Sequence, residues 1–229
     1  PDMLEEGWTF DTKFPGSTGD DNYQLNYLRE LYVKAQSDVS TSVTVPVVWD
    51  KKNETIVNNE SSQIIRFFNT SFNELTGNND DYYPEKHRSE IDKWNDLIYD
   101  NVNNGVYKTG FAKNQEVYNE AVTNLFKVLD QLESHLEGKD YLVGDQLTEA
   151  DIRLYPTLVR FDIVYFTHFK CNVNRIKDYK NLSRYLKNLY EMPAFKNTTN
   201  LDHIKRHYYY SHEDINPYRI VPSGPRDIF

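Results

Sequence analysis

The sequence predicts an α/β segment followed by an all-α domain, and two patterns indicate this fold class. Near the start, two short runs rich in β-branched residues flank a polar turn and precede a helix start. From Tyr82 onward the apolar residues recur with the period of an α-helix, with polar connections between them. The polar run TGNNDDYYP separates the two patterns, so we expect a domain boundary there, with domains at 1–76 and 77–229.

The α/β segment begins with a region in which no regular element is expected. Residues 1–22 are rich in glycine, proline and polar residues, which predicts an irregular loop. A short helix is predicted over 23–35, where the apolar residues fall on one helical face. Residues 43–49 and 55–57 predict an antiparallel hairpin across DKKNE, and a helix start is expected at Ser61 or Ser62. The whole reads as a β-β-α unit.

The second part predicts long helices joined by polar connections. In QLTEADIRL, Thr148 and Asp151 have the spacing of a capping box, so we interpret Asp151 as a structural residue rather than a chemical one. The tail INPYRIVPSGPRDIF contains three prolines and is expected to lie extended over the surface. The expected helices span 85–102, 115–136, 149–161, 182–191 and 201–209.

Composition excludes several classes of function. The 229 residues have a formal charge of −9, which argues against a general nucleic-acid binder, because phosphate affinity requires clustered Lys and Arg. We find no apolar run long enough to span a bilayer and no signal-peptide pattern, so we expect a cytoplasmic protein without membrane contact. The single cysteine, Cys171, excludes an internal disulfide and agrees with a reducing compartment.

A metal site is not expected. His203 and His207 stand at i and i+4 with His212 beyond them, which is one arrangement of zinc ligands. The residues between the first two are Ile204, Lys205 and Arg206, without the carboxylate of the metalloprotease pattern. We therefore interpret these histidines as residues of a packed helix face.

The motifs together resemble a known family. TVPVVWD and NNESS, ahead of a helical domain with QLTEADIRL, resemble the cytosolic glutathione transferases, whose first domain is thioredoxin-like. Over essentially the whole chain, GWTFD, FPGSTGD, IVNNESSQIIR, NNGVYKTGFA, RFDIVYFTHFKCN, DHIKRHYYYSH and INPYRIVPSGP are similar to the glutathionyl-hydroquinone reductases, also called Xi-class glutathione transferases. The resemblance implies a partial thioredoxin-like domain, the β-β-α half, followed by an all-helical glutathione-transferase C-terminal domain.

This resemblance implies a glutathione site in residues 1–76. Trp8 would contact glutathione, and the backbone of Val45, which precedes a cis proline in the family, would pair with its cysteinyl part. Glu60 and Ser61 would hold the γ-glutamyl end. A helix N-terminus suits the carboxylate of that group, and a glutamate side chain suits its ammonium.

The resemblance also implies that Tyr107 and Tyr208 line the pocket for the quinone-derived part and hold or protonate it. A phenol hydroxyl on a rigid ring offers stacking and one directed hydrogen bond to a hydroquinone. The competing interpretation is core packing, since most of the 18 tyrosines of a folded chain fill space.

The implied activity is the glutathione-dependent reduction of S-glutathionyl-hydroquinones to hydroquinones, with glutathione as cosubstrate, by a homodimer formed through the helical domain. The family uses a cysteine nucleophile, which we expect upstream of Pro1 in a longer protein, because Cys171 lies in the helical domain and is interpreted as structural. The alternative is a cysteine-less, glutathione-transferase-like binding or interaction module without catalysis.

Overall fold

A computed structural model describes residues 2–225 of the protein. Within these residues the chain forms two compact units, one made of 2–80 with 210–219 and the other of 81–209 with 220–225. The sequence-based limits place 210–219 with the helical domain, whereas their contacts group them with the first unit. One such contact is the hydrogen bond that the Met3 backbone N–H donates to Ser211 Oγ at 3.0 Å.

The first unit opens with a small hairpin that the sequence did not predict. Strand β1 (Met3–Leu4) pairs antiparallel with β2 (Gly7–Trp8), so Met3 lies opposite Trp8. The prediction of an irregular loop over 1–22 is therefore wrong at this point. Strands of two residues are too short to show the alternation by which a strand is recognised in sequence.

Helix α1 (Leu28–Ala35) begins five residues later than predicted. The Asp20 carboxylate accepts hydrogen bonds from the backbone N–H groups of Tyr23 and Leu25, at 3.3 and 3.1 Å, which fixes this segment as a loop. Gln24 between them has a positive φ of 59°, a conformation incompatible with a helix. Local side-chain bonds to the backbone thus delay the helix despite the apolar pattern.

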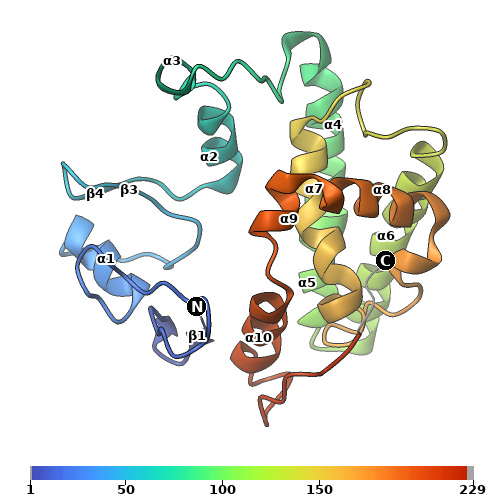
Figure 1. The fold of residues 1–229 in the computed structure, drawn as a ribbon. Helices are drawn as coiled ribbons and strands as arrows, with labels where there is room; N and C mark the ends of the chain where they lie inside the picture. The colour runs from blue at the N-terminus through green and yellow to red at the C-terminus, as the bar shows by residue number, and fades with distance from the viewer. Residues whose placement is uncertain (1, 226–229) are drawn as a thin grey trace. The chain divides into compact units, whose positions relative to one another are not determined.

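The predicted β-β-α unit is present. Strands β3 (Val48–Asp50) and β4 (Thr55–Asn58) pair antiparallel, and helix α2 (Ser61–Phe68) follows (Figure 1). The N-cap of α2 is Glu60, whose carboxylate accepts from the Ser62 backbone N–H at 3.4 Å, so the expectation of a serine cap is wrong. A further short helix, α3 (Asn73–Thr76), was not predicted.

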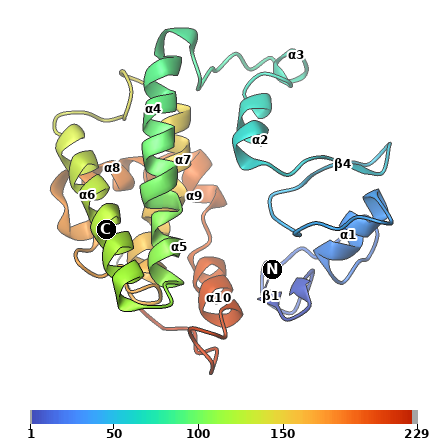
Figure 2. The same ribbon diagram turned by 180° about the vertical axis from the view of Figure 1, so that it is seen from behind.

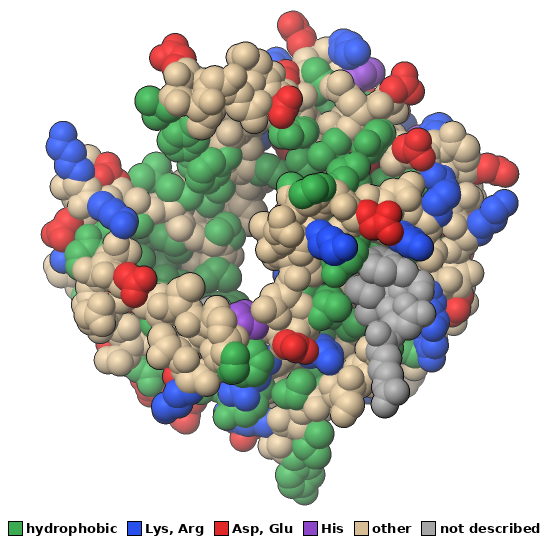
Figure 3. Space-filling model, in the orientation of Figure 1, with side chains coloured by type: hydrophobic (Ala, Val, Ile, Leu, Met, Phe, Trp, Pro, Cys, Tyr) green, Lys and Arg blue, Asp and Glu red, His purple; other side chains and the backbone are tan. Residues whose placement is uncertain are grey.

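The first unit has a small core. Its buried hydrophobic side chains are Leu28, Tyr32 and Ile64, whereas Phe68 and Leu75 are 51% and 84% exposed. Hydrophobic side chains gather on the surface over α2 and the β3–β4 hairpin (Figure 3). A two-stranded sheet with short helices buries little apolar surface, so side-chain hydrogen bonds have a large share in fixing its loops.

The second unit is helical, as predicted: α4 packs against α7, and α6 packs along η2 and α5, which continue α4 (Figures 1 and 2). Short turns of six residues, α5 and α9, were missed because they contain too few residues to show a period. The elements are η1 (Glu85–His87), α4 (Arg88–Ile98), η2 (Tyr99–Asn103), α5 (Gly105–Gly110), α6 (Gln115–His135), α7 (Glu149–Arg160), η3 (Phe161–Tyr165), η4 (Ile176–Asp178), α8 (Lys180–Glu191), α9 (Pro193–Thr198) and α10 (Leu201–Ser211), of which α10 ends in residues grouped with the first unit.

Most of the protein's buried apolar side chains lie in this second unit. The fully buried large side chains come mainly from α4, α6, α7 and α8 and from the turn that follows α7, and they include Ile91, Leu125, Leu154, Phe161 and Tyr185. In the tail, residues 215–225 form neither helix nor strand, and residues 226–229 lie outside the described part. No helix in the described part of the chain combines the length and hydropathy that a bilayer crossing needs.

The start of α7 is fixed by the buried carboxylate of Asp151, as the capping-box spacing predicted. Its oxygens accept from the backbone N–H and hydroxyl of Thr148 at 2.8 and 2.9 Å, from the Leu142 N–H at 2.8 Å, and from the Tyr185 hydroxyl at 2.8 Å. Burial raises the pKa of Asp151, and these four donors act against that shift. One side chain thus joins a loop, a helix start and helix α8.

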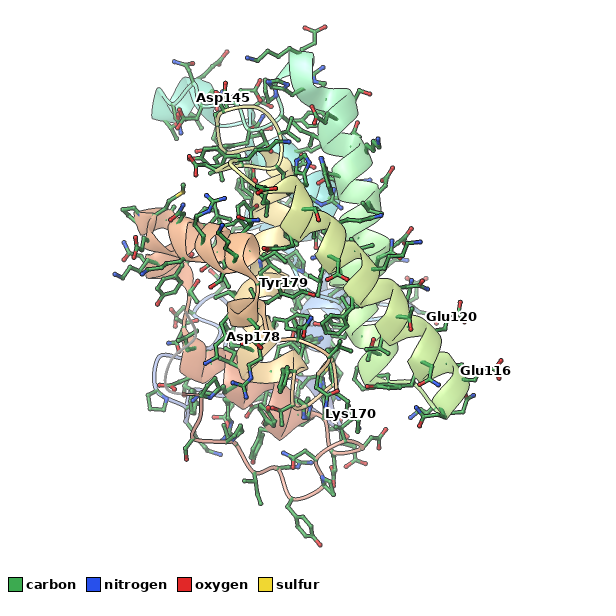
Figure 4. The ribbon with its side chains drawn as sticks, turned by 90° about the vertical axis from the view of Figure 1, so that its right-hand side faces the viewer. Glu116, Glu120, Asp145, Lys170, Asp178 and Tyr179 are labelled. Carbon is green, nitrogen blue, oxygen red and sulfur yellow. The ribbon has the colours of Figure 1, made fainter. Side chains whose placement is uncertain are left out.

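We expect Asp151→Ala to lower the free energy of unfolding of the second unit by about 3 kcal/mol or more, because it leaves four buried donors without their acceptor. Urea unfolding followed by circular dichroism measures this. Asp145→Ala is the matched control: Asp145 is exposed in the loop before α7 (Figure 4), and its loss should cost less than about 0.5 kcal/mol. Equal effects of the two substitutions would contradict the assigned role of Asp151.

Candidate functional site

In the first unit, the segment that contains Val45 is fixed by a buried tyrosine of α1. Tyr32 is 4% exposed, and its hydroxyl donates to the Thr44 carbonyl oxygen at 2.9 Å while accepting from the Thr44 N–H at 3.3 Å. Val45 follows directly, is 46% exposed, and forms a cis peptide bond with Pro46. The backbone before the cis proline is thereby held in place while the Val45 side chain stays accessible.

The same tyrosine connects this segment to the loop before α2. The Asn59 side-chain amide donates to the Tyr32 hydroxyl at 3.1 Å and to Thr44 Oγ1 at 3.3 Å. Glu60 is the next residue along the chain. Val45 and Glu60 were both predicted to bind glutathione, each from a different motif. The residues directly before them, Thr44 and Asn59, are therefore linked through one small hydrogen-bond network.

Glu60 and Ser61 lie exposed at the N-terminus of α2. The Glu60 N–H donates to Asn58 Oδ1 at 2.7 Å, and Ser61 is the first helical residue, where backbone N–H groups have no intrahelical acceptor. The N-terminus of a helix favours binding of an anionic ligand group, and the Glu60 carboxylate beside it favours a cationic ligand group. Trp8 is half-buried on β2, in the separate β1–β2 hairpin.

In the second unit, the hydroxyl groups of three tyrosines are linked by hydrogen bonds. Tyr107 on α5 and Tyr208 on α10 have their oxygens 2.6 Å apart, and the Tyr208 oxygen is 2.7 Å from that of Tyr165. Tyr165 is the last residue of η3, a single π-helical turn that continues α7. Turns of this kind occur frequently at functional sites. The structure thus brings Tyr107 and Tyr208 together and adds a third member.

Burial determines the direction of this hydroxyl chain. Tyr165 is 2% exposed, and within the described residues its hydroxyl bonds only to Tyr208, so its proton must be donated there to avoid a buried donor without an acceptor. The Tyr208 hydroxyl can then donate to Tyr107. The Tyr107 ring is 39% exposed, so its own proton is available to a ligand at the outer end of the chain.

Burial, followed by the neighbouring phenols, raises the pKa of both Tyr165 and Tyr208 above that of an ordinary tyrosine. Both hydroxyl groups therefore stay protonated near neutral pH. The chain is a set of hydrogen-bond donors rather than a base, and it suits a ligand that carries an oxygen on an aromatic ring.

Cys171 does not have the properties of a nucleophile. It is fully buried, with its sulfur 3.9 Å from the carbonyl oxygens of Val106 and Phe169, and burial raises the pKa of its thiol to about 12. Since the thiolate is the reactive form, the thiol is inert near neutral pH. Within residues 2–225, His, Cys, Asp and Glu side chains do not gather in threes or more as metal ligands would.

Comparison with known proteins gives consistent matches. Residues 115–188 match the sequence profile of the glutathione S-transferase C-terminal domain. The glutathionyl-hydroquinone reductase YqjG of Escherichia coli is 56% identical over 98% of this chain and 69% of its own length. The glutathionyl-hydroquinone reductase PcpF of Sphingobium chlorophenolicum is 50% identical over 97% of this chain and 71% of its own length.

The chain belongs to the glutathionyl-hydroquinone reductases, the Xi class of glutathione transferases.

Solved structures of this family have the same fold. The glutathione-bound structure of YqjG superimposes with a TM-score of 0.96 over 99% of this chain and 74% of that one. The Xi transferase of Phanerochaete chrysosporium, 53% identical, gives 0.96 over 99% and 78%. The sequence-based family and fold class, a thioredoxin-like half and a helical transferase domain, are confirmed.

Three residues at the two sites were missed in the sequence of this Xi-class chain. Tyr165 lies in the motif RFDIVYFTHFKCN, yet nothing local distinguishes it from the other tyrosines. Tyr32 and Asn59 act by fixing backbone near other residues, and their partners lie 12 to 27 residues away along the chain. The hydrogen bonds that define these roles form only in the folded protein.

We expect Tyr32→Phe to weaken glutathione binding by roughly 5- to 30-fold while the protein stays folded, because the Thr44 N–H and the Asn59 amide lose a shared acceptor, at about 1–2 kcal/mol. Isothermal titration with glutathione measures this. Tyr155→Phe, which removes the buried hydroxyl that bonds to Thr199 in the second unit, is the control and should bind normally. Unchanged affinity in Tyr32→Phe would contradict a supporting role for Tyr32.

We expect the Cys171 thiol to resist iodoacetamide at pH 8 in the folded protein and to react after unfolding, because burial holds its pKa near 12. Peptide mass spectrometry of native and denatured samples measures labelling of this one position. Rapid labelling in the native sample would show an accessible thiolate, and Cys171 would then again be a candidate nucleophile.

Proposed function

We propose that this protein reduces S-glutathionyl-hydroquinones to hydroquinones, with glutathione as cosubstrate. The proposal rests on the hydrogen-bonded hydroxyl groups of Tyr165, Tyr208 and Tyr107, which end on the exposed phenol of Tyr107. The protein is also 56% identical to a named glutathionyl-hydroquinone reductase. Such a donor fits the ring oxygen of a hydroquinone.

The glutathionyl part would bind the first unit. The Val45 backbone would pair with the cysteinyl peptide group like an added strand. Glu60 and Ser61, at the start of α2, would receive the γ-glutamyl ammonium and carboxylate, and Trp8 would supply an aromatic contact. The Tyr32–Thr44–Asn59 network supports this assignment because it positions both the Val45 and the Glu60 segments in advance.

The reaction would proceed in two exchanges. A cysteine thiolate attacks the glutathionyl sulfur, the sulfur–aryl bond breaks, and the aryl carbon takes up a proton, which releases the hydroquinone and leaves a mixed disulfide. The thiolate of a second glutathione then attacks this disulfide, so that oxidised glutathione leaves and the enzyme thiolate is restored. Because Cys171 is a fully buried thiol with a raised pKa, the nucleophile of the first step would be a different cysteine.

The tyrosine chain would act on the aromatic part. Tyr107 would donate to a ring oxygen of the substrate, while Tyr208 and Tyr165, both protonated, would polarise this donor and replenish its proton. Because burial raises the pKa of both Tyr165 and Tyr208, ionisation of these two residues should not limit the rate at neutral pH.

The oligomeric state and the cellular compartment are a separate part of the proposal. By family resemblance we infer a homodimer that forms through the helical domain. We also infer a reducing, cytoplasmic location, with which the free, buried thiol of Cys171 agrees. A binding module without catalysis is the weaker proposal, since the relatives that match at 50–56% identity are named reductases.

We expect Tyr208→Phe to lower kcat for reduction of a glutathionyl-hydroquinone by about 100-fold, the usual size of one acid–base contribution, because it breaks the hydroxyl chain in the middle. Turnover is followed by liquid chromatography of hydroquinone and oxidised glutathione formed by the natural full-length protein. Tyr155→Phe is the matched control and should retain wild-type kcat, since the Tyr155 hydroxyl bonds to Thr199 instead.

Two results would count against this proposal. The first is no turnover of glutathionyl-hydroquinones by the wild-type protein, which would remove the activity itself. The second is a wild-type kcat in Tyr208→Phe, which would leave the activity but reduce the hydroxyl chain to a packing feature.

A further inference from the structure

Asn103 connects the segment that carries Tyr107 to the helix that leads to Tyr165. It is the last residue of η2, and α5 with Tyr107 follows almost directly. Its side-chain amide donates to the Thr157 hydroxyl at 2.7 Å and to the Arg153 carbonyl oxygen at 3.1 Å, both on α7. One half-buried side chain thus joins two elements that are more than 40 residues apart in the sequence.

The turn of α7 that receives this amide is interrupted by a proline. Pro156 has no N–H group and weakens the backbone hydrogen bonding of the preceding turn, so carbonyl groups there can accept from outside the helix. Thr157 is 5% exposed, and a buried hydroxyl requires a partner. A carbonyl oxygen only accepts, so the amide nitrogen of Asn103 must face α7, and its two N–H bonds can serve both acceptors.

The contact fixes how far η2 lies along α7. Val102, beside Asn103, is fully buried, but apolar packing is not directional and allows small displacements. The two hydrogen bonds are directional and hold this end of η2 at one position. Tyr107 follows this position by four residues, about one helical turn. On the other element, Tyr165 follows Thr157 by eight residues.

We propose that Asn103 is a positioning residue for the tyrosine hydroxyl chain, because it sets the place of Tyr107 relative to α7. This inference rests on the proposed function and adds to it a residue that acts through Tyr107. The oxygens of Tyr107 and Tyr208 are 2.6 Å apart, and such a bond weakens once they separate beyond about 3.0 Å. A small displacement of η2 along α7 is therefore enough to open the outer link of the chain.

Removal of the amide tests the inference. In NMR of the natural protein labelled at tyrosine Cζ, we expect Asn103→Ala to shift the Tyr107 and Tyr208 signals, and kcat for a glutathionyl-hydroquinone to fall about 10-fold. The affinity for glutathione, measured by isothermal titration, should stay unchanged, since glutathione is assigned to the first unit. Asn181→Ala is the matched control: its amide donates to the Glu133 carbonyl oxygen at 3.1 Å, and its loss should leave the signals and kcat unchanged.

A milder pair of variants keeps the test decisive if Asn103→Ala does not fold. Thr157→Val removes the hydroxyl acceptor and keeps the side chain branched, whereas Thr157→Ser keeps the hydroxyl and removes a methyl group. We expect the valine variant to shift the Tyr107 signal and the serine variant to retain the wild-type signal. A role in packing alone would give the reverse order and would overturn the inference.

Two further results would overturn it. The first is wild-type Tyr107 and Tyr208 signals in Asn103→Ala. The second is an equal change in Asn103→Ala and Asn181→Ala, which would indicate general loosening of the second unit. Absence of turnover by the wild-type protein would contradict the proposed function alone, because the NMR comparison still decides the role of Asn103.

Discussion

The helical unit depends on the buried carboxylate of Asp151. Its two oxygens receive four hydrogen bonds, from the loop at Leu142, from Thr148 at the start of α7 and from Tyr185 on α8. A buried charge is tolerated only when it is satisfied in this way, so the three segments must meet at one point. Helix α7 leads directly into η3, and its anchored start therefore helps to position Tyr165 at the end of that turn.

A second constraint operates at the other end of α7. Tyr165 is buried, and within the described structure its hydroxyl contacts only that of Tyr208. Tyr208 must therefore accept the hydrogen bond from Tyr165, so its own hydroxyl proton points toward Tyr107. Burial thereby turns three ordinary phenols into a directed set of donors. In the first unit the Tyr32 hydroxyl has a similar task, since it donates once and accepts twice and so fixes two loop segments at one point.

Sequence predicted those features that local chemistry determines. The capping box at Thr148 and Asp151, the β3–β4 hairpin and the long helices follow from spacing and periodicity, and ordered motifs indicated the family. The start of α1 was misplaced because Asp20 bonds to the backbone of the following loop, and α5 and α9 were missed because six residues show no period. Tyr165 and Tyr208 are 43 residues apart, so their pairing depends on tertiary packing that no local pattern encodes.

We propose that the first unit binds glutathione and that the tyrosine chain of the second unit binds the aromatic part. The most direct measurement is NMR of protein labelled at tyrosine Cζ and tryptophan Nε1, with glutathione alone and then with a non-reactive S-aryl-glutathione that has a ring hydroxyl group. We expect glutathione alone to shift Trp8, and the aryl conjugate to shift Trp8 together with Tyr107 and Tyr208. If the Tyr107 and Tyr208 signals are the same with the conjugate as with glutathione alone, the proposed aromatic site is contradicted.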